Sequence, residues 1–269
     1  MNKKSIIAVL SSVVAFSAQA NDISGFYLQG KLGTSFQHLS NRYVSTDLVD
    51  YDNKEPSFSL KQYLDTKTKA VFAGGVATGF DFNPQFNVPL RLEVEFTARA
   101  KGSSNSGSGP VSSQQRVDFV DGTFVDGTYT LSNGEASVST QTWMVNSYYD
   151  IDTTTPWRPY LSLGVGLAHN RLQSGGRFTA HDHIIEETWF DEWLPLSKSK
   201  TRFAWSIGAG VAYDFDKNWS VDLAYRFLDA GSVSGTMTLY DPVDNEAIQA
   251  KGTAKVRYHD ILAGLRYTF

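Results

Sequence analysis

Residues 260–269 read DILAGLRYTF, and their side chains alternate strictly in character. Successive side chains of a β-strand point to opposite sides of the sheet. One face of this segment consists of Ile261, Ala263, Leu265, Tyr267 and Phe269. The other face carries the charged residues Asp260 and Arg266. One side suits hydrocarbon and the other suits a polar interior, so the segment predicts a strand of a transmembrane β-barrel.

The same strand-like alternation recurs in eight segments of the chain. They span residues 25–39, 69–82, 89–100, 138–151, 159–172, 200–216, 220–231 and 254–269. Helical periodicity is absent outside the first twenty residues. The pattern therefore predicts an all-β protein.

The connections between these segments alternate in length. Those after the second, fourth and sixth segments are short and span residues 83–87, 152–157 and 217–219. Those after the first, third, fifth and seventh are long and span residues 40–68, 101–137, 173–199 and 232–253. Short links at one rim and long links at the other are typical of outer-membrane barrels, whereas a soluble sandwich has no reason to sort its loops this way. We predict a closed, antiparallel, eight-stranded up-and-down barrel with four long extracellular loops.

The N-terminus predicts export. Lys3 and Lys4 precede an apolar stretch over residues 6–16, and Ala18-Gln19-Ala20 is a small-residue cleavage site. We expect a signal peptide over residues 1–20 and a single barrel domain over residues 21–269. Without the two leader lysines, 22 basic residues stand against 28 acidic ones, a formal charge of −6, which argues against nucleic acid as a partner. The chain has no cysteine, which excludes disulfides and cysteine-based sites.

Charged residues within the expected strands should point into the barrel, because a charge that faces lipid near the middle of a membrane costs about 2–4 kcal/mol. The inward set is Lys31, Arg91, Glu93, Glu95, Arg202, Asp222, Arg226, Asp260 and Arg266. Two interpretations fit it: a lumen filled by paired charges, or a narrow passive channel. We favour the filled lumen, because an eight-stranded barrel is just wide enough for its own side chains.

Catalytic and metal sites are weakly indicated. His181-Asp182-His183 with Glu186 and Glu187 could hold a metal ion, but the cluster lies in a long polar connection and we expect it to be solvated. Three further histidines, at positions 38, 169 and 259, have no identifiable nucleophile opposite them. We therefore assign no catalytic residue, metal or cofactor and expect a protein that is not an enzyme.

The long connections are the expected place for recognition, because exposed loops on a rigid scaffold commonly carry it. The third one holds Trp189, Phe190 and Trp193 among acidic residues, and aromatic anchors in a polar rim are typical of binding surfaces. The alternative is that these rings pack on the base of their own loop or lie at the outer surface of the membrane.

Several strand sequences resemble a known group. GFYLQGKLGTSF (25–36), NSYYDI (146–151), RPYLSLGVGLA (158–168), SIGAGVAYDFDKNWSVDLAYRF (206–227) and RYHDILAGLRYTF (257–269) carry the resemblance. They are similar to the opacity-type porin family and to other small eight-stranded outer-membrane barrels, such as the transmembrane part of outer-membrane protein A. The four long connections match nothing in these families.

The resemblance implies a location in the outer membrane of a Gram-negative bacterium and loops displayed for adhesion, with support of the membrane as a second role. A narrow channel is the alternative function, and a lipid-modifying enzyme is a minor one. Lys31 aligns with an interior lysine of the related barrels, and Tyr267 with Phe269 is the expected docking signal for the barrel-assembly machinery. Expected partners are outer-membrane lipid, that machinery, and a host or environmental surface ligand. Since the chain ends at Phe269, we expect no peptidoglycan-binding domain after the barrel.

Overall fold

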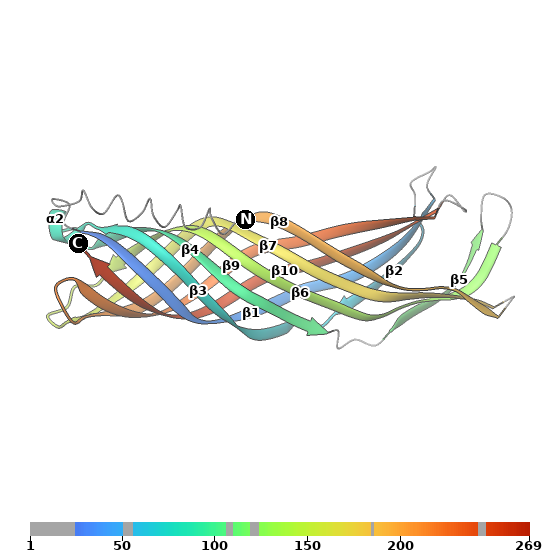
Figure 1. Ribbon diagram of the computed structural model, residues 1–269, viewed down its shortest axis with the longest axis horizontal. Helices are drawn as coiled ribbons and strands as arrows, with labels where there is room; N and C mark the ends of the chain where they lie inside the picture. Colours follow the sequence, from blue (N-terminus) through green and yellow to red (C-terminus); the bar gives the residue numbers. More distant parts are fainter. Residues whose placement is uncertain (1–24, 51–55, 106–109, 119–123, 184–185, 242–245) are drawn as a thin grey trace, which may run out of the picture.

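The computed structural model describes residues 25–50, 56–105, 110–118, 124–183, 186–241 and 246–269. Its strands form one antiparallel sheet that closes on itself, because β10 pairs with both β9 and β1 (Figure 1). The strands are β1 (Phe26–Asp50), β2 (Pro56–Leu64), β3 (Lys67–Asp81), β4 (Leu90–Asn105), β5 (Val111–Asp118), β6 (Phe124–Asp150), β7 (Trp157–Asp182), β8 (Glu187–Asp214), β9 (Trp219–Asp241) and β10 (Glu246–Thr268). One short helix, α2 (Asn83–Phe86), lies in the β3–β4 turn. No helix of the described residues is long and apolar enough to cross a membrane.

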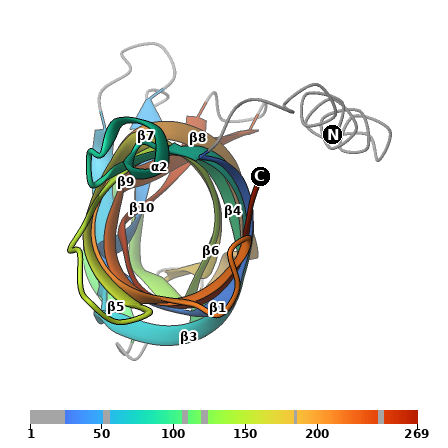
Figure 2. The same cartoon turned by 90° about the vertical axis from the view of Figure 1, so that its left-hand side faces the viewer.

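Eight strands make the barrel wall, and the other two are additions. The wall runs β1, β3, β4, β6, β7, β8, β9 and β10, whereas β2 pairs with β1 and β5 pairs with β6. Passing from paired residue to paired residue around the wall leads from Phe36 on β1 back to Phe26, ten residues away. This stagger tilts the strands around a narrow bore, seen end-on in Figure 2. The predicted eight-stranded barrel is confirmed.

Alternation along each wall strand separates an apolar outer surface from a polar interior. The outward side chains Leu32, Leu163 and Phe203 are each more than 60% exposed to the barrel's surroundings. Their inward neighbours are buried and mostly polar in the half of the barrel that carries the short turns. The outer surface suits hydrocarbon, and the charges are kept from it.

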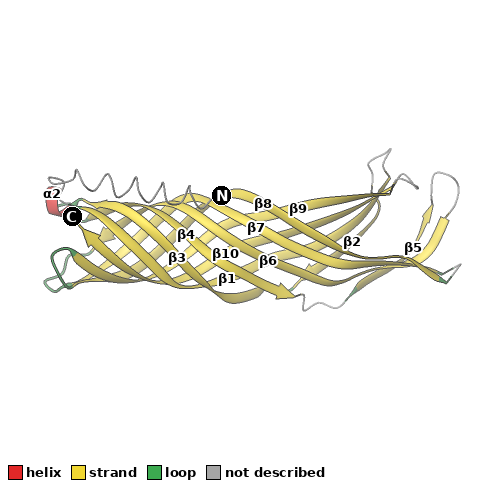
Figure 3. Cartoon of the chain, in the orientation of Figure 1, coloured by secondary structure: helices red, strands yellow, loops and turns green. Residues whose placement is uncertain are grey.

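The other half of the barrel divides into two sheets. Pairing of β3 with β4 ends at Ala73 and Arg99, and pairing of β8 with β9 ends at Trp205 and Asp229. Beyond these points one sheet has the order β2-β1-β10-β9 and the other has the order β5-β6-β7-β8. We call these two sheets the outer sandwich. It forms the long extension at the end opposite α2 and the C-terminus in Figures 1 and 3.

An apolar core joins the two sheets of the outer sandwich. One sheet contributes Val44, Leu60, Leu64 and Val256, and the other contributes Leu131, Phe178, Leu194 and Leu196. All belong to one continuous cluster of buried side chains. The interior of the molecule therefore changes from ionic within the barrel to apolar within the sandwich.

Backbone irregularities mark the level at which the barrel divides. Register shifts occur between Ser40 and Tyr43 in β1, between Arg99 and Gly102 in β4, and between Lys255 and Arg257 in β10. β-Bulges of this kind bend a strand and increase its twist, which lets the wall strands leave the barrel and continue into two flat sheets.

The prediction of four long loops is wrong in its boundaries. β1 continues to Asp50 rather than ending at residue 39, and β7 and β8 continue as a hairpin through most of residues 173–199. The reason is that inward positions of these segments, such as Leu194 and Leu196, alternate with exposed positions and pack into a shared core.

Replacing Phe178 with alanine should lower the free energy of unfolding by about 3–5 kcal/mol, because a fully buried ring would leave a cavity. Urea unfolding in lipid vesicles, followed by tryptophan fluorescence, measures this. Tyr63→Ala is the control, since that ring is 65% exposed and should cost little. Equal stability of the two variants would contradict the buried sandwich core.

Candidate functional site

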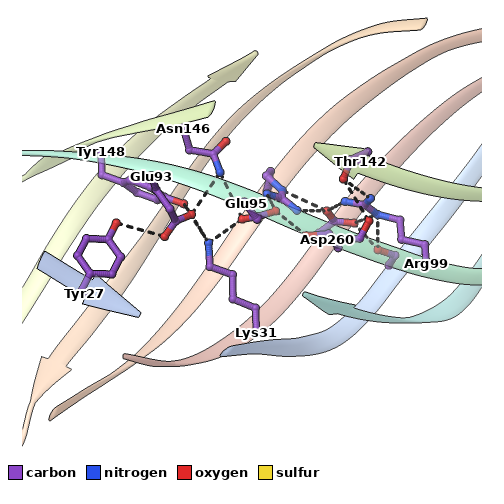
Figure 4. Close-up of polar contacts among 12 residues, drawn as sticks. Tyr27, Lys31, Glu93, Glu95, Arg99, Thr142, Asn146, Tyr148 and Asp260 are labelled. Atoms are coloured by element: carbon purple, nitrogen blue, oxygen red, sulfur yellow. Dashed lines mark hydrogen bonds and ion pairs between the residues drawn. The ribbon is translucent and has the colours of Figure 1, made fainter. Parts of the chain in front are cut away.

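The barrel interior is built around Lys31 on β1. Its Nζ lies 2.6 Å from Glu93 Oε1 and 2.6 Å from Glu95 Oε2, and it donates to the hydroxyl of Tyr148 at 3.1 Å. Tyr27 also donates to Glu93, at 3.2 Å. One ammonium group therefore holds two neighbouring carboxylates, each on an inward position of β4 (Figure 4).

A second group of charges continues this network toward the outer sandwich. Arg226 lies 2.6 Å from Glu95 and 3.0 Å from Asp260, so its guanidinium joins the two carboxylates. Arg99 lies 2.6 Å from Asp260, and Ser35 donates to the same carboxylate. We call Lys31, Glu93, Glu95, Arg99, Arg226 and Asp260 the lumen network.

Further ion pairs fill the end of the barrel that carries the short turns. Arg91 binds Asp150 through two hydrogen bonds of 2.7 and 2.8 Å, and both side chains are almost fully buried. Arg158 joins Asp81 at 3.4 Å and Asp214 at 2.9 Å.

The structure brings together five of the predicted inward residues, namely Lys31, Glu93, Glu95, Arg226 and Asp260. It places three others in smaller contacts: Arg91 with Asp150, Asp222 with Gln29, and Arg266 with Ser220 and Asp214. The sequence analysis missed Arg99, Asp150 and Arg158 as inward charges. Strand parity could have found Arg99, which follows Glu93 and Glu95 at a spacing of two.

The prediction that Arg202 points into the lumen is wrong. It is exposed, and its Nε donates to the carbonyl oxygen of Ser232 at 3.0 Å. The reason is its position on β8 beyond Trp205, where β8 is no longer paired with β9.

These contacts fill the bore with opposite charges that are already paired. Within the described wall, every carboxylate of the lumen network contacts a guanidinium or ammonium group. Buried ions are tolerated only when they are paired and hydrogen-bonded. The arrangement therefore fills this part of the barrel interior with paired charges.

Trp193 lies on the outward side of the β7–β8 hairpin and is 43% exposed. A Cβ added at Gly175 would lie 2.8 Å from its ring, so the indole rests against the glycine. Beside it Arg177 binds Asp191 through two hydrogen bonds of 2.6 Å, which hold the pKa of Asp191 below its ordinary value. The side chains of the other two predicted recognition residues, Trp189 and Phe190, lie outside the described part of the structure.

The histidine cluster does not form a metal site within the described residues. His181 and His183 lie ring to ring at 5.6 Å, and Glu186 is 3.9 Å from His181. The side chains of Asp182 and Glu187 lie outside the part that is described. Among the described residues, no three potential ligands gather around one point.

The three remaining histidines each contact a hydroxyl group on the outer surface of the barrel. The contacts are His38 with Thr68 (3.0 Å), His169 with Thr201 (3.1 Å) and His259 with Tyr225 (2.8 Å). The structure thus places a hydroxyl opposite His169 that the sequence did not reveal. No carboxylate of the described residues forms an ion pair with any of these three rings, so they do not form a nucleophile–histidine–acid triad.

Single and double substitutions of the Arg91–Asp150 pair test whether the buried charges of the lumen depend on their partners. Arg91→Met should lower the free energy of unfolding by about 3–5 kcal/mol, because Asp150 would stay buried without its partner. Arg91→Met/Asp150→Leu should recover most of that loss. Urea unfolding in vesicles measures both, and a double variant as unstable as the single one would contradict the account.

Comparison with known proteins found outer-membrane proteins of similar sequence. Outer membrane protein PagN of Salmonella typhimurium is 32% identical over 98% of both chains. The 31 kDa outer-membrane immunogenic protein of Brucella melitensis is 25% identical, covering 99% of this chain and 100% of its own. Neisserial surface protein A aligns in structure over 91% of this chain and 98% of its own, with a TM-score of 0.41 and 18% identity.

The family model for the outer membrane protein beta-barrel domain matches residues 6–269. The predicted outer-membrane location is therefore confirmed, with the short turns expected on the periplasmic side and the outer sandwich outside the cell. The chain belongs to the outer membrane protein beta-barrel domain family.

Proposed function

We propose that this outer-membrane protein displays the outer sandwich for recognition of a surface ligand, and that the protein acts in adhesion. The observation that carries the proposal is the sandwich itself, a projection with its own apolar core beyond the lipid-facing barrel. A core of this kind holds its outward side chains in fixed positions. Fixed side chains lose less conformational entropy when they bind a partner.

Trp193 is the best-placed contact residue of this projection. Its ring is 43% exposed on a paired strand, and the Arg177–Asp191 ion pair lies beside it. An aromatic anchor surrounded by polar groups is typical of interaction hot spots. Trp189 and Phe190 precede it on β8 and complete the proposed recognition segment.

One relative supports a role at the host surface. The Brucella melitensis relative is named as an immunogenic outer-membrane protein. The outer sandwich of the present chain would be exposed to the host.

A passive channel is the second candidate, and the lumen network argues against it. An ion would have to separate Lys31 from Glu93 and Glu95, or Arg226 from Asp260, inside a narrow bore. We also infer that the protein has no catalytic activity. His38, His169 and His259 have no carboxylate partner among the described residues, and His181 contacts Thr188 and Glu186 only through exposed side chains, with 3.9 Å between His181 and Glu186.

We further propose that Tyr267 and Phe269 form the docking signal for the barrel-assembly machinery. The Phe269 ring lies 5.0 Å from that of Tyr267 and 5.7 Å from that of Phe26. The backbone N–H of Phe269 donates to the carbonyl oxygen of Phe26 at 2.9 Å. The proposed signal thus also lies where the last strand joins the first.

Replacement of Trp189, Phe190 and Trp193 by serine tests the adhesion proposal. Binding of whole bacteria to host cells should fall about tenfold or more, because aromatic hot spots contribute roughly 2 kcal/mol or more each. The control is Tyr43→Ser/Tyr63→Ser, which removes aromatic rings from the opposite sheet. Unchanged adhesion by the triple variant at equal surface levels would exclude this segment, and equal loss in the control would point to general damage.

A further inference from the structure

Two seams open in the barrel wall where it divides into the outer sandwich. One lies between β3 and β4 beyond Ala73 and Arg99, and the other lies between β8 and β9 beyond Trp205 and Asp229. Each half of the molecule keeps four neighbouring wall strands, so the seams lie on opposite sides of the barrel. We call them the β3–β4 seam and the β8–β9 seam.

Both seams are flanked by exposed cations. Lys69 and Lys101 flank the β3–β4 seam, and Lys198, Lys200 and Arg202 follow the β8 side of the other. Lys200 Nζ donates to Ser234 Oγ at 3.2 Å, and Arg202 donates to the carbonyl oxygen of Ser232. These contacts place the β8 cations across the gap from β9.

The seam cations lack the acidic partners that the arginines of the lumen have. Arg91, Arg99 and Arg226 each bind a carboxylate in the lumen. By contrast, none of the five seam cations forms an ion pair with a carboxylate of the described residues. The formal net charge of the chain is negative. These five positive charges can therefore bind an anionic group of another molecule.

The seams lie at the outer edge of the lipid-facing surface. Phe203 is 64% exposed and Lys200 follows it three residues further out on β8, whereas Phe72 is 62% exposed and Lys69 follows it three residues further out on β3. Three residues of a strand span about 10 Å, and side chains three apart point to opposite faces. Lys200 and Lys69 therefore lie on the inward side of their strands, where the open edge of each seam exposes them. The cations therefore stand where acyl chains end and headgroups begin.

We propose that the two seams bind the phosphorylated headgroups of glycolipids in the outer leaflet. Flexible lysines and an arginine donate charge-assisted hydrogen bonds to phosphate oxygens. The neighbouring exposed rings contact the acyl chains of the same lipids. Two opposed headgroup sites fix the depth and tilt of the barrel, and they hold the outer sandwich upright above the membrane.

Lipid retention by the folded, full-length protein tests the proposal. The protein in detergent micelles is mixed with a bisphosphorylated glucosamine-disaccharide lipid, and bound lipid is counted by native mass spectrometry. Lys198→Gln/Lys200→Gln/Arg202→Gln and Lys69→Gln/Lys101→Gln should each weaken retention. The expected loss is about fivefold for each neutralised cation.

The control variant, Lys61→Gln/Lys217→Gln/Lys251→Gln, removes three exposed lysines away from the seams and should retain the lipid. The same lipid without its phosphates should bind weakly to the unmodified protein and to all variants. Equal retention by seam and control variants would overturn the proposal. So would seam variants that keep the lipid but lose a soluble sulfated glycan, which would assign the cations to a host ligand instead.

Discussion

The structure depends on one constraint: a barrel of eight strands leaves room inside only for its own side chains, and the charged ones must lie there because the outer face meets lipid. Charges that enter such a space have to be paired. Lys31 and Arg226 meet this condition by each holding two carboxylates, with Glu95 shared between them. The wall and the paired charges inside it therefore form a single body that spans the membrane.

An interior filled with paired charges leaves the outer surface as the proposed place of function. Above the lipid the same strands bend at register shifts, exchange ionic contacts for an apolar core, and continue as two facing sheets. The proposed recognition residue Trp193 is then carried on a paired strand. The cations of the two seams lie between these regions, so the display surface and the proposed lipid contacts are parts of one continuous structure.

Sequence reasoning predicted the barrel well, because its alternation is enforced by lipid on one side and charge on the other. It was wrong about the extent of the strands, since polar residues such as Thr179 and Asp191 alternate there with Phe178 and Leu194 in short, weak patterns. Arg202 has the alternation expected of an inward residue, but it lies beyond the point where β8 stops pairing with β9. The alternation of side chains does not tell where pairing between two strands ends. Ion pairs across the bore, such as Arg99 with Asp260, join residues far apart in the sequence. A local sequence pattern therefore cannot predict which residues pair.

Single-channel recording in planar bilayers tests the closed lumen most directly. The account predicts that the purified, folded protein shows at most brief and small conductance steps at neutral pH, because the paired charges occupy the bore. Large and steady currents, with an ion selectivity that changes when Glu95 is replaced by lysine, would show an open charged pore and contradict it.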